Sequence, residues 1–267
     1  MSINRSQQGF VAIIELDAPE SLNALTIPDI QALRETLVAC QNDDQVRVIL
    51  ITGAGKKAFC TGANLKATFP PADGFAKGLL LGRDSEAQRG GYTRLIDLSD
   101  LEIWKPIIGV INGYCLGGGM ELALQCDLRV ASHSASFALP EVKVASVPAV
   151  GGVQYLLRAI PAAHAMKLAL TGARIDAAEA LRIGLVSDLY ELDELLDEAL
   201  KLAQQIAANG PLAVQVVKKL ALETAHLAPR EFVAQSNIAW GLLRDSDDRV
   251  EGRRAFGEKR SAVYRGT

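Results

Sequence analysis

The sequence predicts a mixed α/β body followed by an all-helical C-terminal segment. Residues 10–16 and 46–52 are apolar runs typical of buried strands, and a helix pattern that starts at Thr26 lies between them. A strand, a helix and a strand at this spacing indicate a layered α/β architecture. From Glu191 onward the apolar residues recur at helical spacing instead.

The helix after the first strand has a well-marked start. Thr26 can cap it, Pro28 fits its first turn, and the Asp29 carboxylate is favourable beside the helix dipole. Its apolar face is predicted from the spacing of Ile30, Leu33, Leu37 and Val38.

Residues 67–91 are the least regular part of the chain, because they combine prolines and glycines with apolar side chains such as Phe75. They form either a mobile lid or a poorly specified linker. An apolar loop of this length in a compact domain more often shapes a site than extends freely into solvent. Residues 92–101 then return to a helical pattern and lead into an apolar strand at 106–111.

The rest of the chain divides into short core elements and longer helices. The pattern predicts strands over 127–131 and 136–139, a turn over 140–143, a helix opened at 148–152 and a short helix over 177–183. Further helices are predicted from Leu192, and then over 212–227, 230–244 and 247–259. Apolar faces on such terminal helices are expected to pack on the body or on another subunit. We therefore expect two parts, a core over 1–195 and a C-terminal helical segment over 196–267.

The composition excludes several classes of protein. With 267 residues, 49% of them hydrophobic and 22% charged, the chain can bury a sizeable core. A net charge of −3 gives no support for binding nucleic acid, and no apolar run approaches the length of a membrane span. The N-terminus carries no signal or transit pattern, so a cytoplasmic protein is expected if this start is native. Reduced core thiols are expected at Cys40, Cys60, Cys115 and Cys126.

The stretch from Asn112 to Asp127 is the organising feature of the sequence. The strand at 106–111 leads into the glycines 117–119 and then into an apolar, buried helix. Glycines at a helix start leave backbone N–H groups bare, and the helix dipole there attracts anions and developing oxyanions. Glu121 is an ionisable residue in this apolar helix, so it is either paired structurally or placed for chemistry.

Two further segments can join this one in a site. Glu141 follows Pro140 in a rigid turn, and residues 61–66 form a loop of small residues that ends in a cation. Two carboxylates beside bare N–H donors suit acid–base chemistry next to a polarised carbonyl. Taken singly, Glu141 is more often a solvated turn residue and Glu121 a helix-start charge. The hypothesis therefore depends on the three segments together.

Other familiar motifs fail on spacing. A dinucleotide fingerprint, a phosphate loop and a GxSxG motif are absent, and the three histidines show no metal spacing, so no metal site is expected. One alternative stays open, because residues 113–117 form GxCxG between a strand and a helix, as in a cysteine nucleophile elbow at Cys115. We favour Cys115 as a small core residue, since only His164 or His226 could complete a triad and nothing else supports one.

These segments, together with others in the same order, resemble the enoyl-CoA hydratase/isomerase (crotonase) superfamily over nearly the full chain. The matching stretches are 23–25, 51–53, 58–59, 62–66, 105–107, 112–114, 117–123, 126–127, 137–141, 151–152, 170–172 and 256–260. The ordered set is highly specific for the family but not for one substrate. The resemblance implies a spiral of ββα turns with a C-terminal helical trimerisation segment, and assembly as a homotrimer or a dimer of trimers.

The resemblance also implies an acyl-CoA thioester substrate and assigns catalytic roles. The backbone N–H groups of Ala63 and Gly118 would form the oxyanion hole. Glu121 would take a proton from water as the water attacks Cβ, and Glu141 would deliver a proton to Cα. The implied chemistry uses no metal or redox cofactor, and coenzyme A enters as part of the substrate.

The positions that bind coenzyme A in the family are matched in two places. Ala24, Leu65 and Lys66 match positions that line the nucleotide and pantetheine, and a cation beside small residues suits a polyanion. Phe256 and Lys259 match positions that reach the coenzyme from a neighbouring subunit.

Three positions depart from the family pattern. Glu20 and Ser21 stand where a basic residue is common, and Asn64 replaces the usual aspartate. Ala149 and Val150 replace smaller or polar residues beside the acyl pocket, which suggests a changed or narrower acyl site.

Because both glutamates are present, the predicted function is that of a 2-enoyl-CoA hydratase, a lyase of the kind that serves fatty acid metabolism. The alternatives on the same site are a carnitinyl-CoA dehydratase-like activity, suggested by residues 136–141, 256–260 and 264–266, and an enoyl-CoA isomerase. A hydrolase dependent on Cys115 and a non-enzymatic, RNA-binding relative are less favoured.

Overall fold

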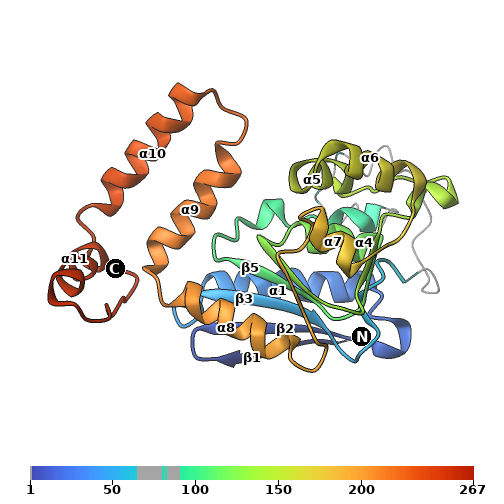
Figure 1. Cartoon of the computed structure of the whole chain (residues 1–267), viewed down its shortest axis with the longest axis horizontal. Coiled ribbons are helices and arrows are strands. Elements are labelled where there is room, and N and C mark those ends of the chain that lie inside the picture. The colour runs from blue at the N-terminus through green and yellow to red at the C-terminus, as the bar shows by residue number, and fades with distance from the viewer. Residues whose placement is uncertain (1, 65–79, 81, 83–90) are drawn as a thin grey trace.

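The chain folds into two sheets that it visits in turn, as the computed structural model of residues 2–64, 80, 82 and 91–267 shows (Figure 1). The larger sheet has the order β1-β2-β3-β5-β7-β10 and the smaller one β4-β6-β8-β9. Strands β1 and β2 pair antiparallel, as do β8 and β9, and the other neighbours are parallel. The strands are β1 (Ser2–Gln8), β2 (Val11–Asp17), β3 (Val48–Gly53), β4 (Ala58–Cys60), β5 (Ile107–Ile111), β6 (Tyr114–Leu116), β7 (Leu128–Ser132), β8 (Ser136–Ala138), β9 (Ile175–Asp176) and β10 (Asp188–Tyr190).

From β3 to β8, the first strand of each consecutive pair belongs to the larger sheet and the second to the smaller sheet. Strands β3, β5 and β7 of the larger sheet are each followed by a short strand of the smaller sheet, namely β4, β6 and β8. Helix α4 (Gly118–Leu124) follows β6, and helices α5 (Gly152–Ala159) and α6 (Ala162–Thr171) follow β8. Repeated strand–strand–helix units of this kind form the spiral of ββα turns that the sequence predicts.

The central strands β2, β3 and β5 of the larger sheet are buried on both faces, which explains why they are continuously apolar. In β2, Ile14 and Leu16 pack in a cluster with helix α1 (Ile27–Gln41), whereas Ile13 packs with helix α8 (Leu195–Ala207) on the other face. Side chains alternate between faces along a strand, so one apolar run supplies both clusters. Helix α8 thus packs into the core, and the boundary at 195/196 stays a prediction.

Three local features differ from the sequence predictions. Strand β1 was not predicted because its residues are mostly polar; it lies at the sheet edge and pairs through its backbone with β2. Val38 is 37% exposed, because the buried stripe of α1 continues through Cys40 instead. Residues 92–101 form two short 3-10 helices, η3 (Tyr92–Ile96) and η4 (Ser99–Leu101), rather than one regular helix.

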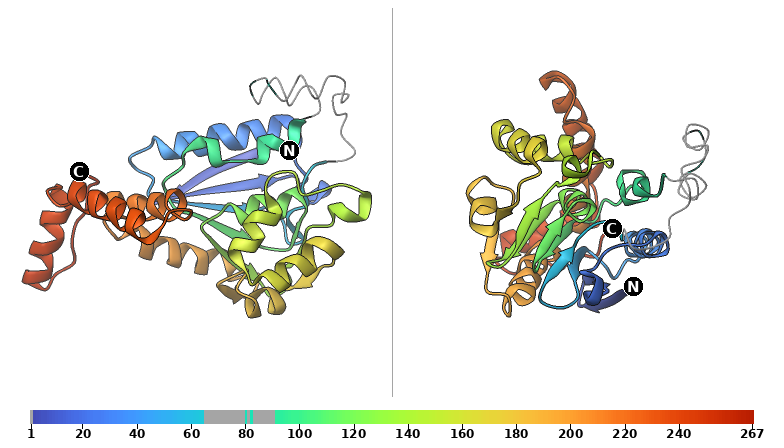
Figure 2. Two further views of the ribbon diagram at one scale, coloured as in Figure 1. Left: turned by 90° about the horizontal axis from the view of Figure 1, so that it is seen from above. Right: turned by 90° about the vertical axis from the view of Figure 1, so that its right-hand side faces the viewer.

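The C-terminal helices leave the body and form an arm. Helices α9 (Pro211–Glu223), α10 (Pro229–Leu243) and α11 (Asp247–Glu258) extend away from the sheets in both orientations (Figures 1 and 2). The remaining short helices are η1 (Pro19–Ser21), η5 (Glu141–Val144) and α7 (Ala177–Arg182). Within the described ranges, no helix has the length and apolarity needed to cross a bilayer.

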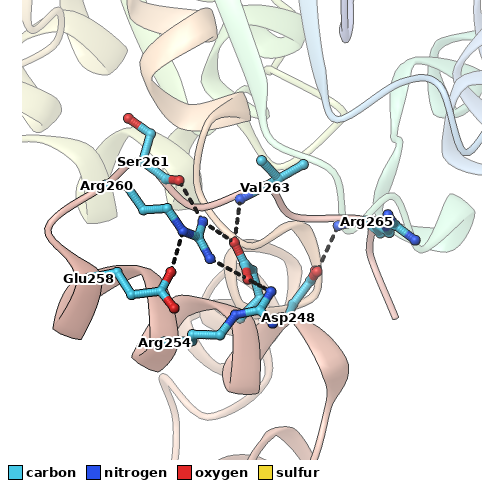
Figure 3. A network of polar contacts seen from close by, with 8 residues as sticks. Asp248, Arg254, Glu258, Arg260, Ser261, Val263 and Arg265 are labelled. Atoms are coloured by element: carbon cyan, nitrogen blue, oxygen red, sulfur yellow. Dashed lines mark hydrogen bonds and ion pairs between the residues drawn. The ribbon is translucent and has the colours of Figure 1, made fainter.

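The last residues of the chain fold back onto α11. The Glu251 carboxylate accepts hydrogen bonds from the Arg260 guanidinium (2.6 Å) and from the Val263 N–H (3.1 Å). The Asp248 carboxylate accepts two more, from the N–H groups of Arg265 (2.7 Å) and Gly266 (2.8 Å), as Figure 3 shows for Arg265. Charged side chains therefore hold the tail of the arm in one conformation.

Candidate active site

The start of α4 lies directly against the loop that follows β4. A Cβ added to Gly62 would come within 2.8 Å of the Gly118 nitrogen, and Gly62 has a left-handed φ of +86°. A Cβ on Gly119 would lie only 2.1 Å from the Cys60 carbonyl oxygen. Only glycine permits both this turn and this close approach. The sequence of small residues thus brings two backbone segments into contact.

Two peptide N–H groups meet at this contact. Leu25 pairs with Ala63 in a parallel bridge, in which Leu25 N–H donates to Gly62 (2.7 Å) and Asn64 N–H donates to Leu25 (2.9 Å). The middle residue of such a bridge turns its own N–H away from the partner. Gly118 is the first residue of α4, so its N–H has no acceptor within the helix. Among the described residues, none accepts a hydrogen bond from the Ala63 or Gly118 N–H.

Glu121 is the buried carboxylate of α4, with 3% of its surface exposed. Its Oε1 accepts hydrogen bonds from the N–H groups of Val150 (2.8 Å) and Gly152 (3.1 Å). Burial raises the pKa of Glu121 to about 7, against the two N–H donors, and the negative charge of Glu141 raises it further. A carboxyl group with this pKa can exchange protons near neutral pH.

Glu141 faces the same helix start from the other side. It is the first residue of η5 and is half-buried, and its Oε2 is buried without a hydrogen-bond partner among the described residues. A Cβ added to Gly117 would lie 3.2 Å from its Oε1. Burial raises the pKa of Glu141, although its own backbone N–H opposes this. An unpartnered buried oxygen of this kind is available to a substrate.

The remaining predicted site residues divide into three groups. Ala24 is buried immediately before Leu25, so it lies beside the paired N–H groups. Leu65 and Lys66 lie outside the described residues. Phe256 and Lys259 lie at the end of α11, which Figures 1 and 2 place far from α4. One chain therefore brings together the predicted catalytic groups but not the C-terminal pair.

The sequence reasoning missed the residues that hold η3 against α4. Gln125 accepts a hydrogen bond from Leu98 N–H (2.7 Å) and donates one to the Ile96 carbonyl (3.0 Å). From α1, Arg34 donates to the Leu95 carbonyl (3.2 Å). Gln125 is the other polar residue in the apolar helix after the glycines, and that exception was the available signal.

A second missed feature is a cavity of about 430 Å³ between η3 and α5. Val150 lines it, and the N–H of the same residue binds Glu121. Its polar lining includes Arg94, Tyr155 and Arg158. The cavity therefore begins beside the catalytic carboxylates.

The alternative of a cysteine nucleophile at Cys115 receives no support from the structure. Cys115 is fully buried, its Sγ lies 3.6 Å from the Gly119 carbonyl oxygen, and burial raises the pKa of its thiol well above the ordinary value. A buried, protonated thiol is a poor nucleophile. His164 is 3.9 Å from Glu179 on the surface instead of near Cys115. Within the part of the chain that is described, no cluster of His, Cys, Asp or Glu has the geometry to hold a metal ion.

The site places two peptide N–H groups beside two carboxylates, an arrangement that can stabilise an oxyanion and move protons. The chain belongs to the enoyl-CoA hydratase/isomerase family, whose family model matches residues 6–267. The crotonase-like spiral with its C-terminal helices, predicted from the sequence, is thereby confirmed.

Known proteins similar to this chain cover nearly all of it. The (E)-benzylidenesuccinyl-CoA hydratase of Thauera aromatica is 43% identical over 266 residues, which span 100% of both chains. The carnitinyl-CoA dehydratase of Proteus mirabilis is 38% identical, over 99% of this chain and 98% of that protein. The structure of an enoyl-CoA hydratase from Bacillus anthracis superposes with a TM-score of 0.89 at 32% identity, over 100% of both chains. These relatives are hydro-lyases, which confirms the predicted class of enzyme.

Proposed function

We propose that this protein is a 2-enoyl-CoA hydratase, which adds water reversibly across the Cα=Cβ bond of an enoyl-CoA thioester. The observation that supports this most directly is the pair of carboxylates, Glu121 and Glu141, at one helix start beside the N–H groups of Ala63 and Gly118. Hydration needs one proton removed from water and one delivered to carbon, so it uses both acids.

The oxyanion hole is the first part of the mechanism. The thioester carbonyl oxygen accepts hydrogen bonds from the Ala63 and Gly118 N–H groups, which stabilise the negative charge of the enolate. Each such donor contributes roughly 2.7–4 kcal/mol in a transition state. Because the donors belong to the backbone and are already in place, little reorganisation accompanies the reaction.

Glu121 and Glu141 move the protons. The Glu121 carboxylate takes a proton from water as the water oxygen bonds to Cβ, and the π electrons of the double bond move into the enolate. Glu141 then delivers its proton to Cα, and the enolate returns to the thioester. The pKa of Glu121, about 7, suits a base that works near neutral pH.

The coenzyme is expected to bind between subunits. Ala24, Leu65 and Lys66 hold it from the same chain, and Phe256 and Lys259 reach it from a neighbour in a homotrimer or a dimer of trimers. Two observations support this, namely that α11 lies far from α4 within one chain and that Phe256 is 87% exposed.

We further propose that the enzyme acts in the cytoplasm and needs no metal or redox cofactor, with coenzyme A as part of the substrate. The buried free thiols support a reducing compartment.

Dehydration of a carnitinyl-CoA thioester is a second candidate function, favoured by the 38% identity to carnitinyl-CoA dehydratase. The benzylidenesuccinyl-CoA relative likewise supports a substituted acyl group over a simple straight chain.

The test is a panel of short, medium, branched and substituted 2-enoyl-CoA thioesters, including crotonyl-CoA. Hydration is followed by loss of the absorbance of the conjugated thioester. We expect at least one member to be hydrated, and the reverse reaction to occur from the corresponding 3-hydroxyacyl-CoA. No turnover with any member would refute the proposal.

A further inference from the structure

The cavity between η3 and α5 adjoins the candidate active site. Its wall contains Val150, whose N–H binds the Glu121 carboxylate. On the opposite side, a Cβ on Gly118 would lie 3.0 Å from Ile96 of η3. An acyl chain with its carbonyl at Gly118 and its Cβ near Glu121 could therefore reach this cavity past Val150 with its far end.

Hydrogen bonds and core packing hold the two walls of the cavity, η3 and α5, in place. On the η3 side, Arg34 donates hydrogen bonds to the Leu95 carbonyl (3.2 Å) and the Asp97 carbonyl (2.5 Å). Gln125 ties the same segment to α4 through Ile96 (3.0 Å). On the other side, α5 packs into the core through Leu156. Side chains presented by held backbone can bind a ligand with little loss of entropy.

Two of the three charged residues that line the cavity are cationic. Arg158 projects from the last turn of α5 and is exposed, and no described residue forms a hydrogen bond or ion pair with its guanidinium. Arg94 and Asp97 line the opposite wall, and both have other interactions. The lining thus carries two guanidinium groups and one carboxylate.

Tyr155 lies between these charges and is half-buried in the same cavity. Burial raises the pKa of its hydroxyl, Asp97 raises it further, and Arg158 lowers it. The hydroxyl therefore stays protonated and can donate a hydrogen bond beside Arg158. Gln154, from the same helix, adds an amide to this end of the cavity.

We propose that the acyl group of the substrate carries a carboxylate at its distal end, and that Arg158 is the specificity-determining residue that binds it, with Tyr155 as a second donor. This inference rests on the proposed hydratase function. A guanidinium binds a carboxylate through two parallel hydrogen bonds, and charged bonds of this kind are stronger than neutral ones. The same cations disfavour an acyl group that ends in a quaternary ammonium.

The experiment compares two substrates of equal chain length, trans-2-hexenedioyl-CoA and trans-2-hexenoyl-CoA, which differ in a terminal carboxylate. The values of kcat and KM are measured for the wild type, Arg158→Gln and Arg158→Lys. Arg182→Gln is the matched control, because it removes a guanidinium from the exposed surface of α7 that lies outside the cavity.

We expect the wild type to prefer the dicarboxylic thioester by about tenfold or more in kcat/KM, as one well-formed charged hydrogen-bond pair provides. Arg158→Gln removes this preference, chiefly by raising KM for the dicarboxylic thioester. Arg158→Lys retains part of the preference, and Arg182→Gln retains all of it. Equal kcat/KM values in the wild type, or an unchanged preference in Arg158→Gln, would contradict the proposal.

Failure of the hydratase function is recognised separately, because neither substrate would then be hydrated. Calorimetric titration with the saturated hexanedioyl-CoA and hexanoyl-CoA measures the affinity for each thioester without turnover. About tenfold tighter binding of the dicarboxylic thioester, lost in Arg158→Gln, supports the role of Arg158. Equal binding of the two thioesters contradicts it.

Discussion

The start of α4 and the C-terminal arm differ in how far their side chains are buried within one chain. At α4, Glu121 is 3% exposed and the surrounding backbone segments touch so closely that only glycine fits. In the arm, Leu242 is 80% exposed, and Trp240 and Phe256 also face outward. The comparison teaches that one chain by itself assembles the proposed acid–base site, whereas the arm leaves apolar side chains exposed, as the proposed contact with another subunit requires.

The largest expected effect is steric and separates the two regions. Gly119→Ala would place a Cβ 2.1 Å from the Cys60 carbonyl oxygen, which the buried backbone cannot relieve. We expect about 3 kcal/mol or more of lost stability, measured by denaturant unfolding. Gly241→Ala is the matched control, because a Cβ there meets nothing within 4 Å in the arm. It should stabilise α10 by roughly 0.5–1 kcal/mol. Equal changes in the free energy of unfolding for Gly119→Ala and Gly241→Ala would contradict this difference between the two regions.

The next largest effect is on the pH dependence of stability, to which Glu121 contributes. Its pKa is raised from 4.5 to about 7 in the folded protein, so the folded state binds this proton more tightly than the unfolded state. The stability that Glu121 contributes is full below pH 4.5 and is lost as pH rises through about 7. We therefore expect Glu121→Gln, a permanently neutral isostere, to be roughly 1–3 kcal/mol more stable than the wild type at pH 8.5. The two proteins should converge in acid, and a variant that is less stable at pH 8.5 would count against a desolvated Glu121.

An intermediate effect is expected from the arm. Phe256→Ala should raise KM for enoyl-CoA substrates by about tenfold, because an aromatic contact contributes up to about 1.5 kcal/mol. The free energy of unfolding should not change, since Phe256 is 87% exposed within the chain. Val250→Ala, from an exposed position of the same helix, is the control. An unchanged KM would show that this residue does not reach the coenzyme.

The smallest effect concerns the fold of the tail on α11. Arg260 holds the pKa of Glu251 well below its ordinary value, with further help from Val263 N–H and Arg254. This contribution is present above the ordinary pKa of 4.5 and fades as pH falls below it. Glu251→Gln should therefore speed hydrogen exchange of the Val263 amide at neutral pH. Glu258→Gln, which contacts only Arg260 in this network, should change it less.

The sequence could predict features that have a local signal, but not contacts between segments that are distant in the chain. The proposed catalytic pair could be predicted because Glu121 interrupts an apolar helix after three glycines and Glu141 follows a proline turn, and both signals are local. Strand β1 was missed because an edge strand is held by backbone pairing, which polar side chains do not reveal. Arg158 and Arg94 were missed because they line one cavity from segments distant in the chain, and nothing local marks either residue. The link made by Arg34 was missed for the same reason, whereas Gln125 did carry a local signal, as a polar residue in an apolar helix.

The central claim is that two carboxylates at one helix start carry the chemistry. Its most direct test is kcat for the best thioester of the panel, measured for the wild type, Glu121→Gln and Glu141→Gln, with Glu179→Gln, which pairs with Arg182 on α7, as control. We predict a loss of about 10²–10⁴-fold in each active-site variant and little change in the control. Full activity in either Glu121→Gln or Glu141→Gln would contradict the two-glutamate mechanism.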